Sequence, residues 1–334
     1  MISVIVPAYN AAARLGNCLT ALQQQTCPPT EIIVVDDGSE DNTIAVAQRR
    51  GAQVITQDHR GAPSARNMGT QQACGDIILF TDADCEPAPD WIAEMVQPFS
   101  DPDVAGVKGA YSTRQREIVA RLAQCEVEER YDRLEQFSTI DFVDGYSAAF
   151  RASALRHVGG FAPVFLGDED GDLSYRLVRR GFKLKFNRRA KVYHWHPTTW
   201  GDYWRRKIWR GYWRTVVFRF HLRKTLHDTH TPQLLKVHIL LVYLGIALIV
   251  AVLFSPALVW LLAVWCIVSF LSAIPFALKV FQVDRPLAIW AWIFIAVRAT
   301  AFAIGAVGAL IGMLFFRDPA VVIRRLGEIL WKGK

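Results

Sequence analysis

Short apolar runs alternate with longer segments of mixed polarity along the first part of the chain. The runs span residues 2–6, 32–35, 53–56 and 77–81. Between the first two runs, Leu15, Leu19 and Leu22 recur at the spacing of one helix face, and "CPPT" ends that stripe. Strand-like runs separated by segments of about a dozen residues or more are typical of crossover helices. The pattern therefore predicts an α/β fold with a mostly parallel sheet and flanking helices.

The pattern changes later in the chain, where long apolar segments replace the alternation. Residues 237–254 and 257–278 are each long enough to cross about 30 Å of hydrocarbon at about 1.5 Å per residue. A third apolar segment covers residues 287–316 and contains Arg298. We therefore predict three parts in chain order. They are a catalytic-type soluble domain over residues 1–199, basic aromatic interfacial helices with a linker over 200–235, and a transmembrane or interfacial helical region with a basic C-terminal tail over 236–334.

Cations and aromatic rings interleave between the soluble and apolar regions. The stretch "WRRKIWRGYWRTVVFRFHLRK", residues 204–224, fits a helix that lies in a membrane interface. The formal net charge of +7 could also suit nucleic acid. Because the apolar segments follow directly, anionic membrane lipids are the expected partner, and no nucleic acid is expected.

The third apolar segment decides where the tail lies. If the soluble domain faces the cytoplasm, two spans return the chain there near Lys279 and Arg285. A third full span would place the basic tail outside, against the positive-inside rule. We therefore expect residues 287–316 to be interfacial, re-entrant or a short hairpin, with three spans as the alternative. The cations of the tail are Arg317, Arg324, Arg325, Lys332 and Lys334.

Cysteine usage and the first residues bear on the compartment. The chain has 6 cysteines, with no CxxC pair and no spacing typical of a zinc site or a disulfide framework. The opening "MISVIVPAYN" lacks a basic segment and a small-residue cleavage site, so we expect no export signal. These features favour a multi-pass protein of the cytoplasmic (inner) membrane whose soluble domain faces a reducing cytoplasm.

Carboxylates gather where the predicted strands end. Asp36 and Asp37 follow the second run, and Asp82 and Asp84 follow the fourth. Ligands bind beyond the carboxyl ends of parallel strands, and adjacent carboxylates repel unless a cation lies between them. The structural alternative is that Asp37 begins a turn and Asp41 caps a helix. Neither GxGxxG nor GxxxxGK[ST] is present, which disfavours nicotinamide-dependent oxidoreductases and P-loop nucleotide triphosphatases.

Five motifs resemble, in order and spacing, those of the family 2 inverting glycosyltransferases with the GT-A fold. They are "VIVPAYN", "VVDDGSEDNT", "RGAPSARNMG", "FTDAD" and "GDEDGDLSYRLVRRG". The similarity covers roughly residues 1–215. It implies a Rossmann-like GT-A catalytic domain that uses a nucleotide-diphosphate sugar, with a UDP-linked sugar favoured.

The resemblance implies roles on the donor side. In the family, the second aspartate of the Asp-x-Asp motif binds Mg²⁺ or Mn²⁺, which neutralises the departing diphosphate. This assigns Asp84 to the metal and Asp82 to the donor, with a solvated acidic loop as the alternative. Arg66 is expected near the diphosphate or the base edge, with an exposed helix position as the alternative. The residues expected around the nucleoside are Pro7, Tyr9, Asp36 and Asp37.

The resemblance also implies roles on the acceptor side. The family's Glu-Asp pair maps onto Glu169 and Asp170, and Asp170 is expected to be the general base that takes a proton from the acceptor hydroxyl. Part of the charge in this cluster also complements the N-terminus of the following predicted helix. A family segment that lines the acceptor subsite matches residues 143–161, with a buried strand as the alternative. It implicates Gly145, Tyr146 and Ser147.

Two histidines are further metal candidates. In "VYHWHP", His194 and His196 would share one face of a presumed strand. In many relatives a histidine in this region reaches the donor phosphate or the metal. Purely structural histidines are the alternative.

The combined expectation is a membrane-bound inverting glycosyltransferase. It would move one sugar to a hydroxyl of a lipid or lipid-linked saccharide, for cell-envelope glycolipid or polysaccharide synthesis. The QxxRW motif of processive synthases is absent, and the corresponding stretch is "RRKIWRGYW". The alternatives are a polyprenyl-phosphate glycosyltransferase, whose ionised acceptor needs no base, and a silent membrane scaffold. A scaffold has no reason to retain the mutually repelling carboxylates Asp82, Asp84 and Asp170.

Overall fold

The computed structural model describes residues 1–315, which form two compact units that interleave along the sequence. The α/β unit consists of Met1–Gln115, Tyr131–Trp195 and Arg223–His230. The helical unit consists of Arg116–Arg130, His196–Leu222 and the described residues from Thr231 onward. Because of this interleaving, the predicted domain boundaries at residues 199 and 235 stay predictions.

An eight-stranded mixed sheet runs through the α/β unit, in the strand order β3-β2-β1-β4-β7-β6-β8-β5. The first four strands of this order pair in parallel, which confirms the crossover pattern. β7 is antiparallel to β4 and β6, whereas β8 is parallel to β6 and antiparallel to β5. Val4, Ile5 and Val6 are fully buried, as expected for a strand covered on both faces. The strands are β1 Ile2–Ala8, β2 Glu31–Asp36, β3 Gln53–Thr56, β4 Ile77–Thr81, β5 Glu86–Pro87, β6 Val104–Ser112, β7 Ser147–Arg151 and β8 Lys183–Tyr193.

Helices pack on the sheet through apolar stripes. The predicted stripe of Leu15, Leu19 and Leu22 is buried on one face of α1. α3 packs on β1 and β2, and Gly69 permits this, because a Cβ there would lie 2.6 Å from Ile5 Cγ2. This packing holds the loops that follow β1, β2 and β4 at one edge of the sheet. The helices are α1 Ala12–Gln23, α2 Thr43–Arg49, α3 Ala62–Gln72, α4 Trp91–Val96, η1 Gln97–Ser100, α6 Ala152–Val158, α7 Glu169–Arg179 and α9 Leu222–Leu226, which begins in the helical unit.

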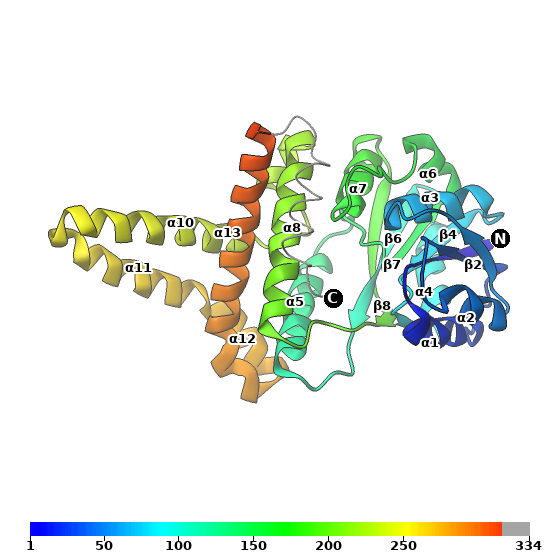
Figure 1. The fold of residues 1–334 in the computed structure, drawn as a ribbon, viewed down its shortest axis with the longest axis horizontal. Coiled ribbons are helices and arrows are strands. Elements are labelled where there is room, and N and C mark those ends of the chain that lie inside the picture. The colour runs from blue at the N-terminus through cyan, green and yellow to red at the C-terminus, as the bar shows by residue number, and fades with distance from the viewer. Residues whose placement is uncertain (316–334) are drawn as a thin grey trace. The chain divides into compact units, whose positions relative to one another are not determined.

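In the helical unit, α8 and α13 run side by side, whereas α10 and α11 form a hairpin that extends away from them (Figure 1). α8 and α13 approach closely because both carry a glycine at the crossing. A Cβ on Gly211 would lie 2.9 Å from Phe302 Cα, and one on Gly305 would lie 2.7 Å from Tyr212 N. The elements are α5 Ile118–Leu134, which continues into the α/β unit, α8 Trp200–Phe220, α10 Gln233–Phe254, η2 Pro256–Leu258, α11 Val259–Ser272, α12 Ile274–Val283, η3 Arg285–Trp290 and α13 Ala291–Phe315.

A buried cluster of charges joins α5, α8 and α13. The guanidinium of Arg298 lies 3.9 Å from Glu126 and 3.8 Å from Glu129. Glu126 also accepts hydrogen bonds from Lys207 Nζ at 2.7 Å and from the Tyr203 hydroxyl at 2.9 Å. A buried charge is costly unless it is paired, so this network compensates an arginine inside an otherwise apolar helix.

Three helical segments are long and apolar enough to cross a membrane. The protein buries 11% of the most apolar window of the first, 6% of the second and 44% of the third. Whether the third segment crosses stays a prediction, and the basic tail lies outside the described residues. The segments are Gln233–Phe254, Pro256–Val283 and Arg285–Leu314.

Candidate active site

A pocket of about 580 Å³ opens where β1, β2 and β4 end. Most residues expected on the donor side line it, which places them around one space. They are Pro7, Tyr9, Asp37, Arg66, Asp82 and Asp84. The pocket wall also includes Asn10, in the turn between β1 and α1 with φ 48°.

Asp37 holds one rim of the pocket in place. Its carboxylate accepts hydrogen bonds from the backbone amides of Arg60 at 2.8 Å and Gly61 at 2.9 Å. The exposed ring of Tyr9 packs against His59, with the centroids 4.2 Å apart and the planes tilted by 32°. This rim therefore offers an ordered loop and a flat aromatic surface.

Asp36 differs from its neighbour. It is 1% exposed, it is absent from the pocket wall, and its Oδ2 accepts a hydrogen bond from the Ser39 amide at 3.1 Å. In this structure Asp36 supports the turn behind the pocket, and its predicted contact with a nucleoside stays a prediction.

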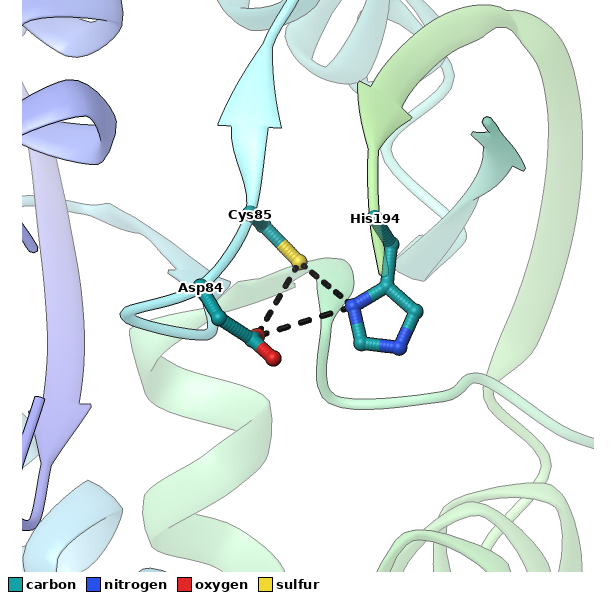
Figure 2. A group of neighbouring side chains, drawn as sticks. All are labelled: Asp84, Cys85 and His194. Carbon is teal, nitrogen blue, oxygen red and sulfur yellow. Dashed lines mark hydrogen bonds and ion pairs between the residues drawn. The ribbon is translucent and has the colours of Figure 1, made fainter. Parts of the chain in front are cut away.

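Asp84, Cys85 and His194 face one another beside the pocket (Figure 2). Their potential ligand atoms all lie within 4.8 Å of one another. His194 Nδ1 is 3.5 Å from Asp84 Oδ1 and 3.6 Å from Cys85 Sγ. A carboxylate and an imidazole at this distance are a donor set that fits a divalent cation whose other positions are filled by ligand oxygens.

Cys85 is the weaker member of this group for a hard cation. Burial, with the neighbouring charges of Asp82 and Asp84, raises the pKa of its thiol well above the usual value. A neutral thiol is a poor metal ligand, because the thiolate is the coordinating form. The carboxylate of Asp84 and the imidazole of His194 are therefore the stronger candidate ligands for a divalent cation.

The expectation that both histidines lie on one strand is wrong. β8 ends at Tyr193, and the backbone amide of His194 donates to the Ser112 carbonyl at 2.9 Å just beyond it. His196 belongs to the helical unit, where its Nε2 lies 2.9 Å from Gln124 Oε1. The strand alternation that grouped the two side chains therefore does not apply, and metal binding by His196 stays a prediction.

Arg66 connects the pocket to the second acidic cluster. Its guanidinium donates to Glu169 Oε1 at 2.7 Å and to Asp82 Oδ1 at 3.1 Å, and it lies 3.9 Å from Asp170 Oδ1. Arg66 is only 4% exposed, so the alternative of an exposed helix position is wrong. A buried guanidinium among carboxylates is the compensating cation that such a cluster requires.

Glu169 and Asp170 lie in the first turn of α7, where negative charge is stabilised by the helix dipole. The backbone amide of Gly145 donates to Asp170 Oδ2 at 2.8 Å, whereas Asp170 Oδ1 accepts no hydrogen bond in the described part of the chain. Burial and the charge of Asp170 raise the pKa of Glu169 to about 7, and burial also raises the pKa of Asp170, both opposed by Arg66. Carboxyls whose pKa is raised in this way have the chemistry of a proton acceptor, and the role of Asp170 as the general base stays a prediction.

Gly145, in the segment before β7, packs closely against Arg66 and Asp170. A Cβ on Gly145 would lie 2.8 Å from both Arg66 Cζ and Asp170 Oδ1. Tyr146 is buried and stacks on Tyr111. Ser147 is fully buried, and its hydroxyl accepts a hydrogen bond from the Trp91 indole at 2.9 Å. In this structure the three residues support the acid pair and the sheet, and their contact with an acceptor stays a prediction.

Three side chains at or near the site were not anticipated. Arg14 lines the pocket and lies 3.7 Å from Asp84 Oδ2, and the signal for it was a cation one turn into the helix that follows the first strand. Cys85 follows the Asp-x-Asp motif directly, and only its position could have flagged it. The fully buried Lys108 forms an ion pair with Asp144, beside the acid pair, and no sequence motif marked it.

Comparison with known proteins identifies the domain. Residues 3–159 match the family described as "Glycosyl transferase family 2". A pre-mycofactocin glycosyltransferase of Mycobacterium tuberculosis is 30% identical over 212 residues, which are 60% of this chain and 44% of that protein. Glycosyltransferase AglE of Haloferax volcanii is 36% identical over 201 residues, which are 55% of this chain and 64% of that protein. The matched part is thus less than two thirds of either relative.

A solved structure shares the fold over most of the chain. The mannosyltransferase PcManGT of Pyrobaculum calidifontis, in complex with GDP-Man and Mn²⁺, superposes with a TM-score of 0.63 at 22% identity. The superposition covers 92% of this chain and 86% of that one. Residues 3–159 are therefore similar to family 2 glycosyltransferases, the chain shares the GT-A fold of a solved structure, and helices apolar enough for a membrane follow.

Proposed function

We propose that the protein is a membrane-bound inverting glycosyltransferase that moves one sugar from a nucleotide-diphosphate sugar to a hydroxyl of a lipid or lipid-linked saccharide. The observation that carries this proposal is the Arg66 bridge. It connects Asp82 in the pocket wall to Glu169 and Asp170, so a donor site and a proton acceptor share one buried cation. Such an arrangement fits a reaction in which a leaving group departs on one side and a nucleophile is deprotonated on the other.

The donor side has the chemistry to hold a nucleoside diphosphate. Tyr9 and the loop ordered by Asp37 suit the nucleoside, and Asp84 and His194 would hold the divalent cation. When bound, that cation would neutralise the charge that develops on the departing diphosphate. Arg14, half exposed on the pocket wall, can add a second positive charge for the phosphates. Asp82 would orient the sugar or ribose through hydrogen bonds.

The acceptor side has the chemistry to remove a proton. Asp170 Oδ1 has a free lone pair, and the Gly145 amide fixes the orientation of the other oxygen. A hydroxyl must lose its proton as it attacks, and a base whose pKa is raised toward the working pH does this best. Glu169 takes the closest contact with Arg66, which leaves Asp170 as the freer oxygen acceptor. An acceptor phosphate that is already ionised would need no general base.

The helical unit supports the proposal of a lipid acceptor. Its hairpin exposes large apolar side chains along most of its length, which suits immersion in a bilayer. The proposed site of action is the cytoplasmic (inner) membrane, and the proposed product is a cell-envelope glycolipid or polysaccharide precursor. The expectation of a UDP-linked donor is part of this proposal, and the choice of sugar is left to experiment.

The test is a transfer assay with the purified full chain. The protein, a membrane lipid extract and Mn²⁺ are incubated with a panel of labelled UDP- and GDP-sugars, with Asp170→Asn in parallel. The proposal predicts that one donor delivers label to the lipid fraction through an acid-resistant linkage and that the variant transfers far less. An acid-labile glycosyl phosphate made equally by both proteins would favour a polyprenyl-phosphate acceptor. No consumption of any donor would favour a silent scaffold.

A further inference from the structure

A groove of about 510 Å³ lies among α10, α11 and α13, within the helical unit. It is formed because α11 packs closely on α10 at Gly245, where a Cβ would lie 2.5 Å from Trp265 Cζ2. Its walls are almost entirely apolar side chains from these apolar helices. The groove is therefore a cavity built for a hydrocarbon ligand rather than for water or a polar solute.

The few polar groups of the groove gather at one end. His238 is near the start of α10 and Ser269 is near the end of α11, so both lie at the base of the hairpin. His238 is 4% exposed, and its Nε2 contacts the Ser272 carbonyl at 3.2 Å. His238 Nδ1 and Ser269 Oγ are buried and have no hydrogen-bond partner among the described residues. Buried polar atoms are normally paired, so these two atoms call for a polar group of a ligand.

We propose that this groove binds one membrane lipid, with a hydrocarbon chain along the hairpin and a hydroxyl group that donates to His238 Nδ1 and accepts from the Ser269 hydroxyl. The other neutral side-chain donors near this end are already bonded. Trp265 donates to the Leu241 carbonyl at 2.7 Å, and Ser272 donates to the Ser269 carbonyl at 2.8 Å. The inference rests on the membrane placement proposed above and not on the sugar transfer.

A lipid fits the groove better than a second protein chain. A helix is about 10–12 Å across with its side chains and packs on another helix through ridges and grooves along its length. A hydrocarbon chain is thinner than a helix, and one lipid hydroxyl can pair with both polar atoms at the end of the groove. Inside a bilayer, lipid is also present on every exposed face of these helices.

The test compares two bulky substitutions on α13, one inside the groove and one outside it. Ala296→Trp fills the groove from its open side, because Ala296 lines it and is exposed. Ile304→Trp is the matched control, since Ile304 is 48% exposed on the same helix but lies outside the groove. The full-length proteins are reconstituted with phosphatidylglycerol, solubilised and stripped in mild detergent, and weighed by native mass spectrometry.

Wild type and Ile304→Trp should each retain one phosphatidylglycerol. In Ala296→Trp the affinity for the lipid should fall by about tenfold or more, because displacing about two buried CH₂ groups has an effect of this size. His238→Leu should retain less lipid than wild type, because the lipid oxygen loses its partner. Equal retention by all variants, or no retained lipid in the wild type, would overturn the inference. So would a wild-type dimer that Ala296→Trp dissociates, which would assign the groove to a second copy. Because no sugar donor is present, none of these outcomes depends on the transferase proposal.

Discussion

At the scale of single residues, Gly145 and Arg66 set the geometry of the candidate site. Gly145 lies so close to Arg66 and Asp170 that its lack of a side chain keeps them in place, and its amide orients the Asp170 carboxylate. Its backbone is not in the left-handed region, so the requirement for glycine is one of space. A small change here should therefore affect catalysis more than folding.

Gly145→Ala should lower transfer by about 10²-fold, because displacing a reacting group by about 1 Å has an effect of this size. Metal-dependent binding at Asp84 should fall less than transfer, because the new Cβ would meet Arg66 and Asp170 and not Asp84. The measurement is kcat for transfer beside the affinity for nucleoside diphosphate with Mn²⁺. Gly201→Ala is the control, because a Cβ there meets nothing within 4 Å. Full activity of Gly145→Ala would mean that Asp170 is not held in a reactive position.

The acid pair also sets a pH dependence. The base must be deprotonated, and burial raises the pKa of both carboxyls, that of Glu169 to about 7. Transfer should therefore rise with pH through the range near neutrality and should be lost as the pH falls. Glu169→Gln removes one of two coupled negative charges, so the acid limb of kcat/KM should move to lower pH. A profile that is already level at about pH 5 in the wild type would rule out this pair as the titrating group.

At the scale of elements, α13 is unlike the other apolar helices because protein covers much of it. It packs along α8 through Gly211 and Gly305, and Arg298 is paired with Glu126 and Glu129. α8 carries exposed cations, including Arg206 and Arg210. A helix bound along its length to a cationic helix cannot cross hydrocarbon without taking those charges with it. Protein covers far less of the hairpin of α10 and α11.

We therefore predict that the hairpin enters the bilayer and that α13 stays at the interface. Single cysteines are placed at Leu314, which is 81% exposed at the end of α13, and at Leu222, which is 73% exposed just after α8, in a cysteine-free protein. An impermeant thiol reagent added to intact cells should label neither position, and both should react after the cells are opened. Labelling of the Leu314 position in intact cells, with Leu222 still protected, would show that α13 crosses.

At the scale of the whole molecule, hydropathy patterning predicted the α/β sheet and the apolar hairpin, because burial on both faces and immersion in lipid both require continuous apolar runs. The motif resemblance predicted the pocket residues, because Asp37, Asp82 and Asp84 follow strand ends. Patterning failed where a role depends on long-range packing. Arg66 meets Glu169 across a separation of 103 residues, and Arg116–Arg130 joins the helical unit, neither of which local sequence encodes. The shared strand face of His194 and His196 was wrong because β8 ends at Tyr193, before either histidine.

In the proposed reaction, Asp84 serves the departing diphosphate and Asp170 serves the acceptor, with Arg66 between them. The most direct test is calorimetric titration of UDP and GDP into the full chain with Mn²⁺, beside the transfer assay, for Asp84→Ala and Asp170→Asn. Asp84→Ala should lose metal-dependent binding and transfer together. Asp170→Asn should bind the diphosphate nearly as well as wild type while transfer falls by about 10²–10⁴-fold. Near wild-type transfer by Asp170→Asn, or unchanged metal-dependent binding by Asp84→Ala, would contradict this division of labour.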